Sequence, residues 1–301
     1  MDVLSNYHSH CNYCDGSSQM EDYILEAVNQ GLPSYGFSSH APIPYESKWS
    51  MQASALPSYL RGVQALKQEW ESVIEIYKSL EFDYIPNVTG SLEEVMINLD
   101  LDYTIGSIHF IDFLDTETPW EIDGSNEKFE KGLHQIFDGD IQKVLTRYFE
   151  LTQEMVRIAK PTIVGHLDKI KIQNYYKPYF SEDESWYIKL VEETLQTIKD
   201  SGKLLEVNTR GWYKSKTQEV YPSNWILYRA NQLGIPVVIN SDAHVPSEIS
   251  AGFNLALKTL EEVGYKHVFQ MENGLWQPQE IQKFQGLKLK VQASVTRLNH
   301  R

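Results

Sequence analysis

Apolar residues in this chain follow two alternating patterns, short compact runs and longer stretches with helical spacing. The compact runs predict strands at residues 3–7, 35–38, 74–82, 103–108, 162–164, 204–207 and 236–239. The longer stretches predict helices at 20–29, 57–72, 91–99, 126–137, 141–159, 184–200 and 223–232. Strands that alternate with helices require a parallel sheet, and seven such units favour an α/β barrel over an open sheet.

Length and composition are compatible with one domain built on this pattern. Of the 301 residues, 42% are hydrophobic and 12% aromatic, which is enough for a sizeable core, and no linker or repeat divides them. We therefore predict a single domain over residues 1–301. No apolar run approaches the length of a membrane span and the N-terminus lacks an export signal, so we expect a cytoplasmic protein without a membrane partner. The sequence does not indicate an oligomeric state.

The two cysteines, Cys11 and Cys14, form a Cys-x-x-Cys pair directly after two histidines. A zinc ribbon would need a second Cys or His pair with similar spacing, and a redox motif normally opens a helix after a strand. We therefore expect two free thiols, as in proteins of a reducing cytoplasm.

Acidic residues outnumber basic ones by 41 to 27, which gives a formal net charge of −14. Binding to a nucleic-acid backbone needs a basic stripe, so we predict no nucleic-acid partner. A site that holds several divalent cations is nevertheless locally positive, and it can attract a small phosphorylated metabolite.

Six of the nine histidines follow directly after predicted strands, where side chains from different strands of a parallel barrel converge. Three carboxylates accompany them. The candidate metal ligands are His8, His10, Asp15, His40, Glu81, His109, His166, Asp242 and His244. His8 and His10 are two residues apart on a strand, so both imidazoles point to one face. The other histidines, His134, His267 and His300, fall on helical or terminal segments and are predicted to be solvated.

This ligand set predicts a catalytic metal site. Imidazole together with carboxylate suits zinc, iron or manganese better than calcium or magnesium. Structural zinc sites are usually closed by four protein ligands, whereas six histidines and three carboxylates are too many for one ion and enough for two or three. Closely spaced ions stabilise the attacking and leaving oxygens of a displacement, so we predict metal-assisted hydrolysis.

Four short motifs in these segments resemble those of the polymerase and histidinol phosphatase (PHP) superfamily of metal-dependent phosphoesterases. They are His8-Ser9-His10, Gly106-Ser107-Ile108-His109, Gly165-His166 and Asp242-Ala243-His244, and the resemblance spans residues 1 to about 255. Further strings, Cys14-Asp15-Gly16, Leu80 to Pro86, Gly165 to Asp168 and Glu206 to Thr209, are similar to those of the histidinol-phosphatase branch. The resemblance implies a distorted, TIM-like (β/α)7 barrel that hydrolyses L-histidinol phosphate to L-histidinol and phosphate, a step of histidine biosynthesis.

The same resemblance implies a trinuclear centre of three divalent transition-metal ions. His8, His10, Glu81 and Asp242 would hold the first ion, Glu81 would bridge to a second held by His109 and His166, and Asp15, His40 and His244 would hold the third. The family's phosphate-binding arginine is expected after His166, where this chain has Lys169 and Lys171, and Arg210 and Lys214 follow later. A lysine contacts phosphate as a point charge and not as a bidentate fork, so the phosphate clamp is expected to be weaker or rearranged.

The expected mechanism is attack of a metal-bridging hydroxide on phosphorus, while Arg210 or Lys171 neutralises the developing charge. Asp242, His244 and Arg210 are the expected catalytic residues. Either Asp242 or a metal-bound water protonates the leaving alcohol, and the sequence does not distinguish the two.

Glu206 and Asn208 lie two residues apart at the end of the sixth predicted strand, so both face the site. They either hold the amine or hydroxyl of the substrate or satisfy neighbouring backbone groups. The candidate substrate-binding residues are accordingly Lys171, Glu206, Asn208 and Arg210.

Two other functions fit the same residues. A relative that hydrolyses nucleotides or trims DNA ends would share the motifs, although the acidic balance and the lack of an attached basic domain count against DNA. A metal-binding module that has lost catalysis would usually lack some ligands, and none is missing from this sequence.

Overall fold

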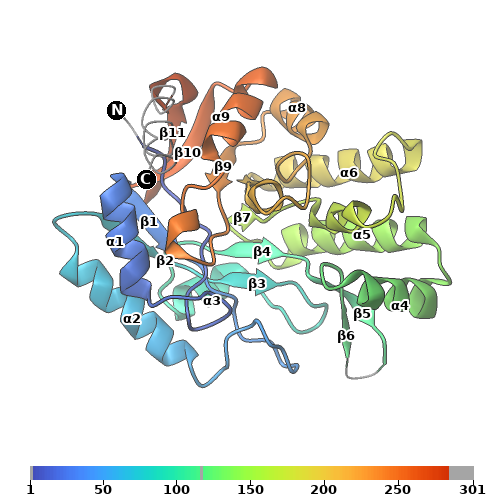
Figure 1. The fold of residues 1–301 in the computed structure, drawn as a ribbon, viewed down its shortest axis with the longest axis horizontal. Coiled ribbons are helices and arrows are strands. Elements are labelled where there is room, and N and C mark those ends of the chain that lie inside the picture. Colours follow the sequence, from blue (N-terminus) through green and yellow to red (C-terminus); the bar gives the residue numbers. More distant parts are fainter. Residues whose placement is uncertain (1–2, 116–117, 285–301) are drawn as a thin grey trace, which may run out of the picture.

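The computed structural model describes residues 3–115 and 118–284, and strands alternate with helices along them (Figure 1). The helices are α1 (Met20–Gln30), α2 (Leu56–Glu69), α3 (Leu92–Asn98), α4 (Asn126–Phe137), α5 (Ile141–Ile158), α6 (Ser185–Ser201), α7 (Arg210–Tyr213), α8 (Asn224–Leu233) and α9 (Phe253–Glu262), with the 3-10 helices η1 (Lys169–Tyr175) and η2 (Pro246–Glu248). The strands are β1 (Ser34–Phe37), β2 (Glu75–Lys78), β3 (Glu81–Asp83), β4 (Ile105–Ser107), β5 (Phe110–Phe113), β6 (Pro119–Glu121), β7 (Ile163–Val164), β8 (Leu204–Asn208), β9 (Val237–Asn240), β10 (His267–Glu272) and β11 (Leu275–Glu280).

Parallel pairing dominates the centre of the fold. Five parallel strands in the order β3-β4-β7-β8-β9 form the largest sheet, and β1 pairs with β2 in parallel. A parallel bridge joins His40, after β1, to Glu81 of β3, and the extended segment 6–9 has parallel bridges to Tyr35 of β1 and to Ala243 after β9. These pairings connect the seven expected strand segments in a closed order. The α/β class with a parallel sheet is therefore confirmed, and the carboxyl ends of the strands meet at one end.

The first predicted strand, 3–7, is not a regular strand, which corrects the sequence-based expectation. Hydrogen bonds to side-chain oxygens replace part of the backbone ladder there. The backbone amide of Ser5 donates to Gln270 Oε1 at 2.6 Å, and the backbone amide of Tyr7 donates to Asn240 Oδ1 at 2.8 Å. The third predicted strand, 74–82, is divided into β2 and β3 because β2 pairs with β1 whereas β3 pairs with β4.

Two antiparallel hairpins lie outside the predicted pattern. β5 and β6 form one, and β10 and β11 form the other around Asn273 and Gly274, whose φ angles of 52° and 77° suit a tight hairpin turn. The expectation that His267 lies on a helical or terminal segment is wrong, because it begins β10, although its side chain is exposed as predicted. His134 is exposed on α4, and His300 lies outside the described residues.

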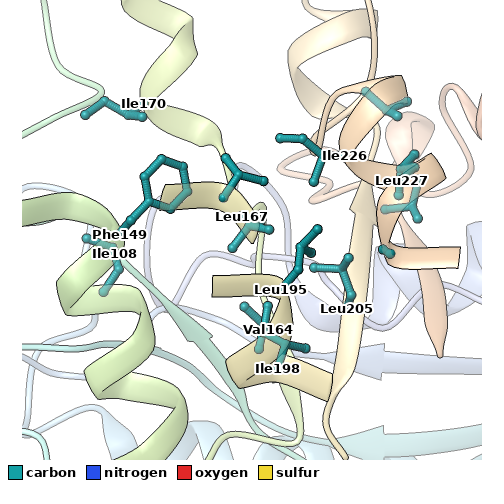
Figure 2. Close-up of a cluster of buried hydrophobic side chains, with 14 of the residues drawn as sticks. Ile108, Phe149, Val164, Leu167, Ile170, Leu195, Ile198, Leu205, Ile226 and Leu227 are labelled. Atoms are coloured by element: carbon teal, nitrogen blue, oxygen red, sulfur yellow. The ribbon is translucent and has the colours of Figure 1, made fainter. Parts of the chain in front are cut away.

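Helices cover the strands on both sides: α1 and α2 lie on one side, and α5, α6 and α8 on the other (Figure 1). Figure 2 shows Val164 of β7 and Leu205 of β8 facing Leu195 and Ile198 of α6, with Leu227 of α8 beside them. Each such buried aliphatic side chain stabilises the fold by about 1.5–3 kcal/mol. This packing holds the strands whose ends carry the predicted ligands. Within the described residues, no helix is long and apolar enough to cross a membrane.

Candidate metal centre

The nine predicted metal ligands lie together at the carboxyl ends of the parallel strands. His8 and His10 end the extended first segment, Asp15 lies in the loop before α1, His40 follows β1, Glu81 begins β3, His109 follows β4, His166 follows β7, and Asp242 and His244 follow β9. Asp242 has φ 54°, a left-handed conformation that turns the chain sharply after β9. A non-glycine residue in this region costs about 1–3 kcal/mol, and such strain is concentrated at functional sites.

Four groups of ligand atoms, each within 4.8 Å of one another, have the composition of a metal site. They are His8, His10 and Asp242; His10, Asp15, His40 and His244; Glu81, His109 and His166; and His40, Asp83 and His109. The first three groups together contain all nine predicted ligands. The fourth adds Asp83, which the sequence did not single out.

Three buried imidazole nitrogens of the centre lie around one oxygen of Glu81. His8 Nε2, His10 Nε2 and His40 Nδ1 lie 3.2, 3.5 and 3.0 Å from Glu81 Oε2. These three nitrogens are buried and have no hydrogen-bond partner among the described residues. Buried polar atoms are normally paired, so this donor set of imidazole and carboxylate fits a divalent transition metal.

Two buried carboxylates orient the imidazoles from behind. His8 Nδ1 donates to Glu206 Oε1 at 2.6 Å, and His109 Nδ1 donates to Asp83 Oδ1 at 2.8 Å. A histidine whose one nitrogen donates to a carboxylate presents the lone pair of the other nitrogen to a metal. Glu206 and Asp83 therefore fix both the tautomer and the direction of two predicted ligands.

Glu206 and Asn208, predicted as substrate-binding residues, are fully buried behind the ligands and do not line the cavity of the centre. Glu206 also accepts the backbone amide of His166 at 2.8 Å. Asn208 Nδ2 donates to Glu206 Oε2 at 3.0 Å and to Asp242 Oδ2 at 3.3 Å. Of the two interpretations that the sequence allowed, these contacts match the one in which both side chains satisfy neighbouring polar groups.

Two cationic side chains line the cavity over the ligands, which has a volume of about 270 Å³. Lys169 Nζ lies 2.9 Å from Asp123 Oδ2 and 3.0 Å from His109 Nε2. Arg210 Nη1 donates to the backbone oxygen of Asp242 at 2.7 Å. Arg210 thus lies where the sequence expected a cation.

Lys171, like Glu206 and Asn208, is a predicted substrate-binding residue that does not line this cavity. Its Nζ lies 2.9 Å from Asp168 Oδ2 and donates to Ser223 Oγ at 2.6 Å, in a buried network away from the ligands. The local geometry of the chain explains the difference, because η1 directs Lys169 and Lys171 to different sides. Lys214 pairs with Glu248 at the surface.

Burial and mutual charge set the protonation of the centre. Burial lowers the pKa of His10 to about 4, and the neighbouring His244 adds to this shift. Burial alone would also lower the pKa of His8, but the surrounding Glu206 and Glu81 carboxylates outweigh it and raise that pKa. Burial opposes ionisation of Glu81 too, yet its histidine neighbours hold the pKa of this carboxyl well below its ordinary value.

Lys169 and Asp123 form an ion pair at the wall of the cavity. Burial opposes ionisation of Asp123, but the ammonium of Lys169 outweighs it and lowers the Asp123 pKa to about 2. Burial likewise disfavours the Lys169 ammonium, and Asp123 reverses this effect and raises the Lys169 pKa. Both groups are therefore ionised at neutral pH.

Sequence reasoning missed four residues of the site: Trp49, Asp83, Glu121 and Asp123. Asp83 could have been predicted from the sequence, because it lies two residues after Glu81 on one strand and its side chain therefore points to the same side. The other three lie in or beside irregular segments, where hydrophobic periodicity gives no position for a side chain.

Cys11 and Cys14 are free thiols, as predicted. Cys14 Sγ lies 3.6 Å from His10 Nδ1, yet neither cysteine belongs to a metal-ligand group found among the described residues. Burial raises the pKa of both thiols, which keeps them protonated.

Parallel strands whose carboxyl ends carry buried histidines and carboxylates define a metal-site protein of the α/β class. The chain belongs to the PHP domain family, whose profile matches residues 6–210. The family profile covers seven of the nine predicted ligands. The other two, Asp242 and His244, lie beyond the matched residues, and the fold brings them beside the first seven.

Proteins similar to this chain in sequence or in structure carry consistent names. The chain is 29% identical over 273 residues to a protein of Deinococcus radiodurans named probable histidinol-phosphatase, covering 89% of this chain and 96% of that one. It is 28% identical over 271 residues to the histidinol-phosphatase of Bacillus subtilis, covering 83% and 97%. The crystal structure of histidinol phosphate phosphatase from Lactococcus lactis, complexed with Zn, L-histidinol and phosphate, matches with a TM-score of 0.68 at 19% identity, covering 91% of this chain and 98% of that one.

Proposed function

We propose that this protein is a metal-dependent phosphomonoesterase that hydrolyses L-histidinol phosphate to L-histidinol and phosphate, in histidine biosynthesis. The observation that carries the proposal is the grouping of all nine ligand residues into three adjoining sets beneath a cavity with two cationic side chains. The names of the relatives, which match nearly their whole length, support the substrate.

Three divalent ions are the occupancy that these sets favour. One set joins His8, His10 and Asp242, a second joins Glu81, His109 and His166, and the third contains Asp15, His40 and His244 together with His10. Divalent ions in such positions supply Lewis acidity and a nucleophile at neutral pH. Zinc, iron and manganese all suit these ligands.

Lys169 and Arg210 bind and orient the phosphate. Both line the cavity, Lys169 from η1 and Arg210 from α7. Because Asp123 keeps Lys169 protonated, Lys169 and Arg210 can both donate charge-assisted hydrogen bonds to a phosphate dianion. Fixed charges placed where negative charge develops lower the barrier without reorganisation.

Asp242 acts as a metal ligand in the proposed centre. Burial disfavours its ionised form, but His8, His10 and Arg210 outweigh this effect and hold the Asp242 pKa well below its ordinary value. A carboxyl that is ionised throughout the neutral range has no proton for the leaving alcohol.

The test is a comparison of substrates on samples whose metal content is measured. Specificity constants are determined for L-histidinol phosphate, nucleoside monophosphates and single-stranded DNA, with metal analysis of the same protein. We expect L-histidinol phosphate to be preferred and chelation to abolish turnover. A specificity constant for nucleotides equal to or above that for L-histidinol phosphate would reject the proposed substrate, and a metal-loaded protein without turnover on any ester would favour an inactive binding module.

Two histidine variants test the assignment of the metal ligands. His109→Ala removes a buried ligand, and we expect loss of bound metal together with loss of turnover. His134→Ala is the matched control, since His134 is exposed on α4 and away from the cavity, and it should change neither quantity. Equal behaviour of the two variants would contradict the assignment of the ligands.

A further inference from the structure

A second cavity adjoins the one above the metal ligands. Its volume is about 750 Å³, against about 270 Å³ for the first. Trp49 and Glu121 line both cavities, so the two hollows meet at these side chains. The larger cavity is also lined by Tyr45, from the loop between β1 and α2, and by Phe110 of β5.

Trp49 forms the wall between the two cavities. Its indole stacks on the ring of Phe110 with centroids 5.4 Å apart and planes 19° apart. It also contacts the imidazoles of His40 and His109, at centroid distances of 4.5 and 5.5 Å. Its Nε1 donates to Glu121 Oε1 at 2.5 Å. This hydrogen bond and the stacked rings hold Glu121 at the junction of the cavities.

Glu121 is the carboxylate at this junction that remains available to a ligand. Asp123, its neighbour in the first cavity, is committed to Lys169. Glu121 Oε2 lies 3.6 Å from Lys128 Nζ, but the Lys128 side chain is 68% exposed, and exposed pairs of this kind are weak. A cation that enters from the first cavity can therefore replace Lys128 beside Glu121.

We propose that the second cavity binds the alcohol part of the phosphoester and that Glu121 selects an ammonium group on it. The inference rests on the proposed function, because it takes the phosphate to lie between Lys169 and Arg210. An ester chain that leaves the phosphate passes Glu121 where the cavities meet. An ammonium group on that chain pairs with Glu121, and a flat ring beyond it packs against Trp49 and Phe110. The substrate class is a phosphorylated amino alcohol with a planar ring.

The experiment measures binding of the product alcohol without any turnover. Dissociation constants are determined by calorimetry for L-histidinol and for its analogue without the amino group, with wild type and with Glu121→Gln. Glutamine keeps the shape of the side chain and the oxygen that accepts from Trp49, and it removes the charge. We expect wild type to bind L-histidinol about tenfold tighter than the analogue, since a hydrogen bond to a charged group is worth about that factor. In Glu121→Gln this preference should fall to about twofold, with binding of the analogue unchanged.

Two further variants make the result specific. Glu127→Gln changes an exposed carboxylate in the first turn of α4, outside both cavities, and should keep the tenfold preference. Trp49→Leu removes both the stacking surface and the hydrogen bond that holds Glu121, so it should weaken binding of L-histidinol and of the analogue and also lower the preference for the amine. Loss of preference in Trp49→Leu with full preference in Glu121→Gln would overturn the assignment of Glu121.

The outcome is independent of the substrate test. If Glu121→Gln keeps the preference for L-histidinol over its analogue, the inference is wrong even where wild type hydrolyses L-histidinol phosphate selectively. If wild type hydrolyses nucleotides better and still prefers the amine in a Glu121-dependent way, the proposed substrate fails and the ammonium site stands.

Discussion

The substitution Glu206→Gln is a direct test of how the ligands are held. Glu206 is fully buried, and each of its oxygens accepts two hydrogen bonds. The donors are His8 Nδ1 at 2.6 Å and Asn240 Nδ2 at 2.9 Å on one oxygen, and the His166 amide at 2.8 Å and Asn208 Nδ2 at 3.0 Å on the other. A glutamine of the same shape replaces one of these oxygens by an NH2 group, which is itself a donor.

The two asparagine neighbours cannot adapt to this change. The carbonyl oxygens of Asn240 and Asn208 already accept the backbone amides of Tyr7 and Arg210, so neither side-chain amide can flip without losing a partner. With the amide nitrogen toward the His166 amide, two donors lose their acceptor; with it toward His8, the imidazole can change tautomer and accept, so that Asn240 Nδ2 alone loses its acceptor. A hydrogen bond to a charged group is worth about 1.5–3 kcal/mol, and the less costly orientation therefore gives an expected loss of about 1.5–3 kcal/mol. The total stability of a protein is only about 5–15 kcal/mol.

The assay is urea unfolding of the metal-free protein in the presence of a chelator. Glu192→Gln is the control, because Glu192 pairs with Arg229 at the surface and its loss should cost less than about 1 kcal/mol. A second readout is zinc affinity, which we expect to fall about 10–100-fold in Glu206→Gln, as for other residues that orient metal-bound histidines. A stability loss no larger than that of the control would refute the reasoning.

Three more outcomes follow from the described contacts. Lys169→Met should lower kcat/KM for the phosphoester about 10–100-fold in steady-state assays while bound metal persists, and unchanged kinetics would remove Lys169 from the phosphate site. The Asp123 pKa is lowered from 3.8 to about 2, so the stabilisation it provides is complete above 3.8 and disappears as the pH falls toward 2. The difference in unfolding free energy between wild type and Asp123→Asn should accordingly be constant at neutral pH and shrink only below about pH 4, and a decline at higher pH would contradict the pair. Gly132→Ala places a Cβ 2.1 Å from Trp120 Cε2 and should cost about 1–3 kcal/mol in urea unfolding, whereas Gly90→Ala, which meets no atom within 4 Å, should be nearly neutral.

The ligands of the centre could be predicted because each depends on a local pattern. His40, His109 and His166 follow short apolar runs that do form strands or lie beside them, and parallel strands bring their carboxyl ends together. The alternation of runs was sufficient for the α/β class and for the helices α1 to α6 and α8. Although the third predicted strand is divided into β2 and β3, Glu81 still lies beside the other predicted ligands.

The residues around the ligands could not be predicted in the same way. Trp49 and Asp123 lie in segments without periodicity, so only tertiary packing determines where their side chains point. Lys169 and Lys171 are equivalent by composition and spacing, and the geometry of η1 alone separates them. The first segment lost its regular ladder because Gln270 and Asn240 supply side-chain acceptors, which are contacts across more than 230 residues.

These long-range contacts also bear on how the protein is made. The segment that holds His8 and His10 is fastened to residues at the far end of the described chain, through the Ser241 amide on Asn6 Oδ1 and the His10 amide on the Ala243 oxygen. On the ribosome, the first histidines emerge long before Asp242 and His244 have been synthesised. A growing chain can therefore expose metal-binding side chains without any way to complete the centre, and loaded enzyme arises only once translation has passed His244.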